Sequence, residues 1–80
     1  MERKILKEQL ENSIQNGLIK EAEVLLLEYK KVCDSKDEVC SIEAIINIYN
    51  NKLKEALKFI RKGLKYNIFN GDLYFTMGNV

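Results

Sequence analysis

The stretch Leu18-Ile19-Lys20-Glu21-Ala22 has a near copy further along the chain, in Leu53-Lys54-Glu55-Ala56, in which Ala56 matches Ala22. Sliding the whole sequence in this register aligns six identical residues and keeps apolar positions matched, so that Leu26 falls on Ile60. A second step of the same length begins a third copy and places Val39 on Leu73. A period of about 34 residues predicts a tandem repeat in which each unit contains two helices.

Apolar residues recur at helical spacing in five segments, each bounded by residues that begin or end helices. Asn16 and Gly17 are expected to end the first helix, and Asn70 to cap the fifth. Ser35 and Glu38 form the S-x-x-E pattern of a capping box before the third. Because β-branched residues favour sheets, the many isoleucines of this third segment make a β-strand the alternative to a helix. The expected helices cover residues 2–16, 19–33, 37–49, 52–66 and a segment from residue 70.

The amino-acid composition of the chain excludes several classes of function. The chain has 80 residues, with 13 basic and 12 acidic side chains, two Cys and no His, which suits one small domain. Without His, the usual zinc sites and His-based triads are excluded, so we expect no metal, no cofactor and no enzymatic activity. Cys33 and Cys40 are expected to be reduced packing residues, with a disulfide or redox pair as the alternative. No apolar run is long enough to span a membrane, and cytoplasmic localisation is expected.

The run Tyr74-Phe75-Thr76-Met77-Gly78-Asn79 resembles the aromatic-x-x-Leu-Gly opening of tetratricopeptide repeats, and the chain is similar to that family over nearly its whole length. The resemblance implies an all-α fold of tandem antiparallel helix-turn-helix repeats in a right-handed solenoid. It implies one domain over residues 1–80, with repeats at 3–36 and 37–70 and the start of a third at 71–80. Cys40 departs from the family, where a large aromatic is usual. The residues implied to pack the repeats are Ala22, Ala56, Gly63, Tyr74, Met77 and Gly78.

The resemblance also implies a function. The first helices of successive tetratricopeptide repeats line a concave surface, which suits a non-catalytic module that binds a protein or peptide partner. An apolar centre within a charged rim would supply affinity and register. Ile45 and Ile48 have a second interpretation, in which they pack against another part of a longer protein or a second copy. The residues expected to line the groove are Lys4, Lys7, Glu11, Ser41, Ile45, Ile48 and Phe75.

Stretches 18–22, 53–56 and 69–74 resemble, in addition, the short helical-repeat region that precedes the catalytic domain in some clostridial glycosyltransferases. That resemblance implies an accessory domain packed against a catalytic domain beyond residue 80. The fifth helix begins a repeat without its partner helix. We therefore expect a fragment of a longer protein that self-associates through the apolar face of this helix.

The basic fourth helical segment offers a competing function. Residues 52–65 hold six cations and one acid, for a net charge of +5. A nucleic acid or an anionic membrane surface would bind such a patch. The charge is local, however, because residues 1–40 carry nine acids against seven bases. A solvated helix face is the favoured interpretation, and no nucleic-acid partner is expected.

Overall fold

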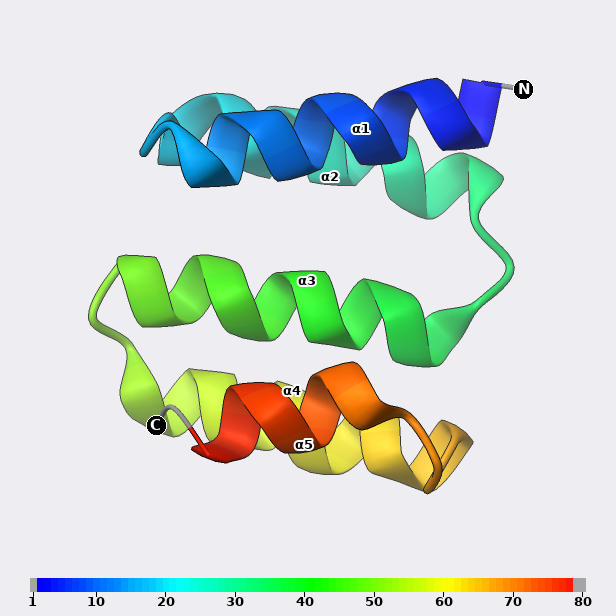
Figure 1. Cartoon of the computed structure of the whole chain (residues 1–80), viewed down its shortest axis with the longest axis vertical. Helices are drawn as coiled ribbons and strands as arrows, with labels where there is room; N and C mark the ends of the chain where they lie inside the picture. The colour runs from blue at the N-terminus through cyan, green and yellow to red at the C-terminus, as the bar shows by residue number, and fades with distance from the viewer. Residues whose placement is uncertain (1, 79–80) are drawn as a thin grey trace. The chain divides into compact units, whose positions relative to one another are not determined.

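The computed structural model describes residues 2–78, which are helical apart from short connections (Figure 1). The five expected helices are confirmed, with ends that differ from the expected ones by about one residue. The third expected helix, residues 37–49, for which a β-strand was the alternative, is helical throughout. Its isoleucines lie between residues that favour the start and the end of a helix. The helices are α1 (Glu2–Gln15), α2 (Ile19–Val32), α3 (Lys36–Tyr49), α4 (Leu53–Tyr66) and α5 (Gly71–Gly78).

The chain divides into two compact units, Met1–Asp34 and Ser35–Val80. In the first unit α1 packs against α2 as a helical hairpin. In the second α3 packs against α4, and α5 contacts both of them (Figure 1). The all-α fold is thus observed within each unit, whereas a single solenoid domain over residues 1–80 stays a prediction.

The turn inside each hairpin has the same backbone geometry. Gly17 (φ 75°) and Asn51 (φ 62°) lie one repeat period apart and are left-handed, the conformation that ends many helices. The N–H groups of the following residues, Leu18 and Lys52, each donate to the carbonyl oxygen five residues earlier, at 2.8 Å in both turns. Each of the four hairpin helices has 14 residues. The backbone of the hairpins therefore repeats with the period of the sequence.

Small residues allow the helices of the second unit to approach closely. Ala44 and Ala56 are fully buried in one cluster with Ile60 and Leu73. An ideal Cβ placed on Gly63 would lie 2.7 Å from Leu73 Cδ1 and 2.9 Å from Cys40 Cβ, distances that real side chains do not tolerate. Glycine at this position therefore lets α5 seat its first apolar residue between α3 and α4.

A polar cluster fastens the loop before α5 to the start of α3. The Asp37 carboxylate accepts hydrogen bonds from Ser35 Oγ (2.7 Å), Asn70 Nδ2 (2.7 Å) and Asn67 Nδ2 (3.2 Å). The Ser35 hydroxyl lowers the pKa of Asp37 most, burial opposes it, and the two amides add to the lowering. The cluster joins residues that are about 30 positions apart in the sequence.

Two cap predictions have different outcomes. Asn70 is confirmed as a cap of α5, since its Oδ1 accepts the Leu73 N–H at 3.1 Å. The Ser35 half of the capping box is wrong: Ser35 stands at the N-cap position of α3, but its side chain makes no cap hydrogen bond. Its hydroxyl donates instead to the carboxylate of Asp37, because a charged acceptor forms a stronger hydrogen bond than a neutral one.

Candidate functional site

The predicted groove residues of the first unit lie on one face of α1. Lys4 and Glu11 are exposed and Lys7 is half-buried. Their spacings of three and four residues place them on the same side of the helix. They form a charged strip on the hairpin, and its role as the rim of a binding groove stays a prediction.

The predicted groove residues of the second unit have mixed accessibility. Phe75 is 75% exposed, and Ile45 and Ile48 are half-buried, with Ile48 packed against the core cluster. Ser41 is only 5% exposed, so the prediction that it lines an open surface is wrong. The position on α3 that we assigned to the groove faces inward at Ser41. A concave surface that combines both sets stays a prediction.

The six predicted packing residues divide into two groups. Ala22, Ala56 and Gly63 are buried. Tyr74 is 50% exposed, Met77 and Gly78 are also exposed, and an added Cβ on Gly78 would have no heavy atom within 4 Å. On α5 the buried positions are instead Leu73 and Thr76, because these two side chains face the hairpin on which α5 rests.

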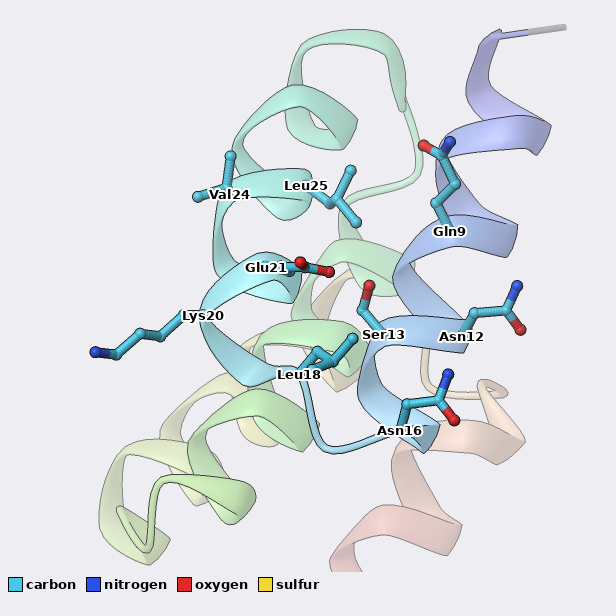
Figure 2. A pocket seen from close by; sticks show the side chains of 9 residues that line it. All are labelled: Gln9, Asn12, Ser13, Asn16, Leu18, Lys20, Glu21, Val24 and Leu25. Atoms are coloured by element: carbon cyan, nitrogen blue, oxygen red, sulfur yellow. The ribbon is translucent and has the colours of Figure 1, made fainter.

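A groove that was not predicted from the sequence lies along the first hairpin (Figure 2). It is open and has a volume of about 710 Å³. Figure 2 shows Glu21 and Leu25 reaching from α2 toward α1, while Lys20 and Val24 point outward. We call it the amide groove, after the side chains that α1 contributes. Its lining consists of Gln9, Asn12, Ser13, Asn16, Leu18, Lys20, Glu21, Val24 and Leu25.

The two walls of the amide groove differ in chemistry. On the α1 side the lining includes three residues with side-chain amides, Gln9, Asn12 and Asn16, and on the other side it includes the aliphatic side chains of Leu18 and Leu25. Figure 2 shows the Asn12 amide on the outer side of α1, away from α2. The amides follow one another at spacings of three and four residues. This regular spacing of amide residues is the sequence signal that could have revealed the groove. The family resemblance pointed to the charged strip of Lys4, Lys7 and Glu11, which lies on a different face of α1.

The basic side chains of α4 form a second exposed surface. At 100° per residue, Lys54, Lys58, Arg61, Lys62 and Lys65 share the face opposite the buried one. Glu55 lies at the edge of this basic stripe and forms an ion pair with Lys58 at 3.7 Å, with both side chains largely exposed. Exposed pairs of this kind contribute little to stability. A phosphate-binding role for the stripe stays a prediction.

Neither a metal site nor a membrane span is found within residues 2–78. No three His, Cys, Asp or Glu side chains come close enough together there to hold a metal ion, and none of the helices in that range has the length and apolar character needed to cross a bilayer. Cys40 is buried and Cys33 is half-buried.

Comparisons with protein families, curated proteins and solved structures give no match to this chain. The tetratricopeptide resemblance therefore depends on the residues and the period with which they recur. It enters the functional argument as a proposal.

Proposed function

We propose that the chain is a tetratricopeptide-like helical-repeat module that binds an extended peptide segment of a partner protein in the amide groove. The observation that carries the proposal is a groove of about 710 Å³ whose lining combines three amide-bearing residues of α1 with the aliphatic side chains of Leu18 and Leu25. That volume falls within the roughly 300–1,000 Å³ of ligand sites.

The chemistry of the groove suits a peptide backbone. Each Asn or Gln amide offers two N–H donors and a carbonyl acceptor, and an extended peptide presents the complementary groups at regular intervals. The aliphatic wall around Leu18 and Leu25 offers contact to apolar side chains of the same peptide. Apolar contacts of this kind supply affinity, and hydrogen bonds fix the register.

The charges of the groove favour a peptide without strong net charge. Its lining holds one cation, Lys20, and one carboxylate, Glu21. Because the two signs are balanced, long-range attraction to a highly charged ligand is small. Affinity should therefore change little with ionic strength, in contrast to binding at the basic stripe.

The repeat component of the proposal is supported by backbone geometry within each hairpin. The left-handed residues Gly17 and Asn51, and the hydrogen bonds that close the two turns, recur one repeat period apart. Helical repeats stack through neighbouring hairpins and expose long surfaces to extended ligands. The right-handed solenoid belongs to this proposal and follows from the family resemblance.

A random 12-residue peptide library displayed on phage tests the binding function. We expect selection to yield peptides whose affinity falls about five-fold in the Gln9→Ala and Asn12→Ala variants, since one hydrogen bond contributes ~1 kcal/mol. Gln15→Ala is the matched control, because Gln15 is an exposed amide on the same helix but outside the groove lining. Its affinity should equal that of the unmodified chain.

Two results would contradict the proposal. The first is a selection that returns no peptide able to bind the purified chain. The second is a set of selected peptides that the Gln9 and Asn12 variants bind as well as the unmodified chain does. Loss of those peptides in Ile45→Asp, with helicity preserved in circular dichroism, would move the site to the apolar surface predicted from the sequence.

A further inference from the structure

Two large apolar side chains stand at the tip of the turn between α4 and α5. Ile68 is 59% exposed and Phe69 is 86% exposed. They are the central residues of a turn in which the Asn70 N–H donates to the Asn67 carbonyl oxygen at 3.3 Å. Such positions usually carry glycine or small polar residues. We call Ile68 and Phe69 the apolar tip.

Hydrogen bonds hold the backbone of this turn in place. The Phe69 N–H donates to Asn67 Oδ1 at 3.0 Å, and the side-chain amides of both flanking asparagines donate to the Asp37 carboxylate. The turn is therefore fastened to the start of α3 by polar groups, and the exposed side chains of the apolar tip contribute little to it. Side chains displayed on such a preorganised turn lose less conformational freedom when they bind another surface.

Cations lie beside the apolar tip. The basic stripe of α4 ends at Lys65, three residues before the tip. At the start of α3, the Lys36 Nζ lies 5.4 Å from the centroid of the exposed Tyr66 ring, and the charge of Lys36 offsets that of the neighbouring Asp37. Residues 52–72 hold six cations and two acids, for a net charge of +4. Exposed apolar groups and a surplus of positive charge thus meet at the end of α4.

The internal repeat indicates that the chain itself leaves this surface open. One period earlier, the residues matched to the apolar tip are Asp34, which is exposed, and Ser35, which is half-buried. The helix after them, α3, is already covered by α4, and Asp34 still faces water. The five positions of α2 that match the basic stripe are exposed as well, namely Lys20, Val24, Leu27, Glu28 and Lys31. A further helix that covered α5 as α4 covers α3 would therefore leave both the apolar tip and the basic stripe accessible.

We propose that the basic stripe and the apolar tip bind the surface of an anionic lipid bilayer, with Ile68 and Phe69 inserted among the headgroups. The cations attract acidic phospholipids, and each basic residue near such a surface strengthens binding about five-fold. The apolar tip moves from water into the interfacial region, which adds attraction that does not depend on charge. This surface belongs to the second unit, and the proposal does not depend on the amide groove.

The apolar tip favours a bilayer over a nucleic acid as the anionic partner. Cations alone are sufficient to bind a phosphate backbone, and single-stranded bases stack on aromatic rings. Ile68 offers neither a charge nor a ring. An aliphatic and an aromatic side chain next to lysines are typical of segments that lie in the membrane interface. The charge pattern alone favours a solvated face, and the exposed apolar tip at its end is what favours a bilayer.

A single tryptophan reports insertion directly, because the chain has none of its own. In Phe69→Trp we expect the fluorescence maximum to move to shorter wavelength with vesicles of phosphatidylcholine that contain about one-third phosphatidylserine, and not with phosphatidylcholine alone. Tyr49→Trp is the matched control. Tyr49 is an exposed aromatic residue at the far end of α3 from Asp37 (Figure 1), about 18 Å along the helix, so its emission should stay unchanged.

Vesicle sedimentation measures how much each component contributes to affinity. Phe69→Ser should weaken binding about ten-fold, whereas Tyr49→Ser should leave it unchanged. Lys65→Ala should weaken binding about five-fold. Lys31→Ala, the same change one repeat period earlier, should alter it less than about two-fold, because Lys31 is paired with Glu28 at 3.6 Å. All four side chains are exposed, so the variants should unfold like the unmodified chain.

Three results would overturn the proposal. The first is a chain that binds vesicles of neither composition. The second is equal vesicle binding by the unmodified chain and Phe69→Ser. The third is a single-stranded RNA of mixed sequence that binds more tightly than the vesicles and loses affinity in Phe69→Ser, which would assign the apolar tip to base stacking. None of these results would affect peptide binding in the amide groove, which lies in the first unit.

Discussion

A methyl group added at Gly63 would meet two neighbours within the second unit. The ideal Cβ lies 2.7 Å from Leu73 Cδ1 and 2.9 Å from Cys40 Cβ. The end of the leucine side chain can rotate away, but the cysteine Cβ is fixed to the backbone of α3. Gly63→Ala therefore requires α4 to move from α3, or α5 to move outward.

Two opposing terms set the size of the effect. Overpacking of a filled site costs about 1–3 kcal/mol. Alanine stabilises a helix interior by about 0.8–1 kcal/mol relative to glycine. The net expectation is a loss of about 1 kcal/mol, with faster hydrogen exchange concentrated in α5, because this short helix is anchored mainly through Leu73 and Thr76.

Urea unfolding followed by circular dichroism measures this loss, and Gly78→Ala is the matched control. Both glycines lie in helices, but only at Gly63 would the methyl group contact another helix. Gly78→Ala should leave the free energy of unfolding unchanged or raise it. If Gly63→Ala also raised it, the close approach of α3, α4 and α5 at this glycine would be refuted.

Two further predictions concern the polar cluster and the turns. The pKa of Asp37 is lowered by Ser35 and the two amides, so the stability that its carboxylate contributes is present above the ordinary pKa of 3.8 and is lost as pH falls below it. The difference in unfolding free energy between the unmodified chain and Asp37→Asn should therefore shrink from pH 6 to pH 3; a constant difference would contradict the role of the charge. In the turns, Gly17→Ala should cost about 1 kcal/mol, because alanine disfavours the left-handed region, whereas Asn51→Gly should change stability by less than about 0.5 kcal/mol since glycine adopts it freely. Equal losses in both variants would contradict the shared turn geometry.

The helices were predictable because their signals are local. Apolar spacing fixes which segments are helical, and a residue such as Gly17 ends a helix through its own backbone freedom. The matched burial of Ala22 and Ala56 was also accessible, since the repeat aligns them before any coordinates are known. Local rules were sufficient wherever a residue acts within its own helix or turn.

The misses involve partners that lie far apart in the sequence or choices between two acceptors. Ser35 had a cap pattern that predicts a bond to the backbone, but Asp37 offered a charged oxygen to its hydroxyl. The bonds from Asn67 and Asn70 to that carboxylate depend on how the loop before α5 returns to α3, which spacing alone does not encode. The amide groove likewise requires two helices to be placed side by side.

The two hairpins share a backbone pattern, yet side chains at matched positions lie in different environments. Asn12 is exposed at the amide groove, while its match in α3, Ile46, is 5% exposed. Ser13 lines the groove, while its match, Asn47, donates its side-chain amide to the Glu43 carbonyl of its own helix at 2.8 Å. The turn geometry preserves the hairpin, while at one pair of matched positions the buried Ile46 of α3 corresponds to the exposed, polar Asn12 of α1. A repeat resemblance therefore predicts the hairpins without predicting the ligand, and the binding surface is best sought at the positions where the copies differ.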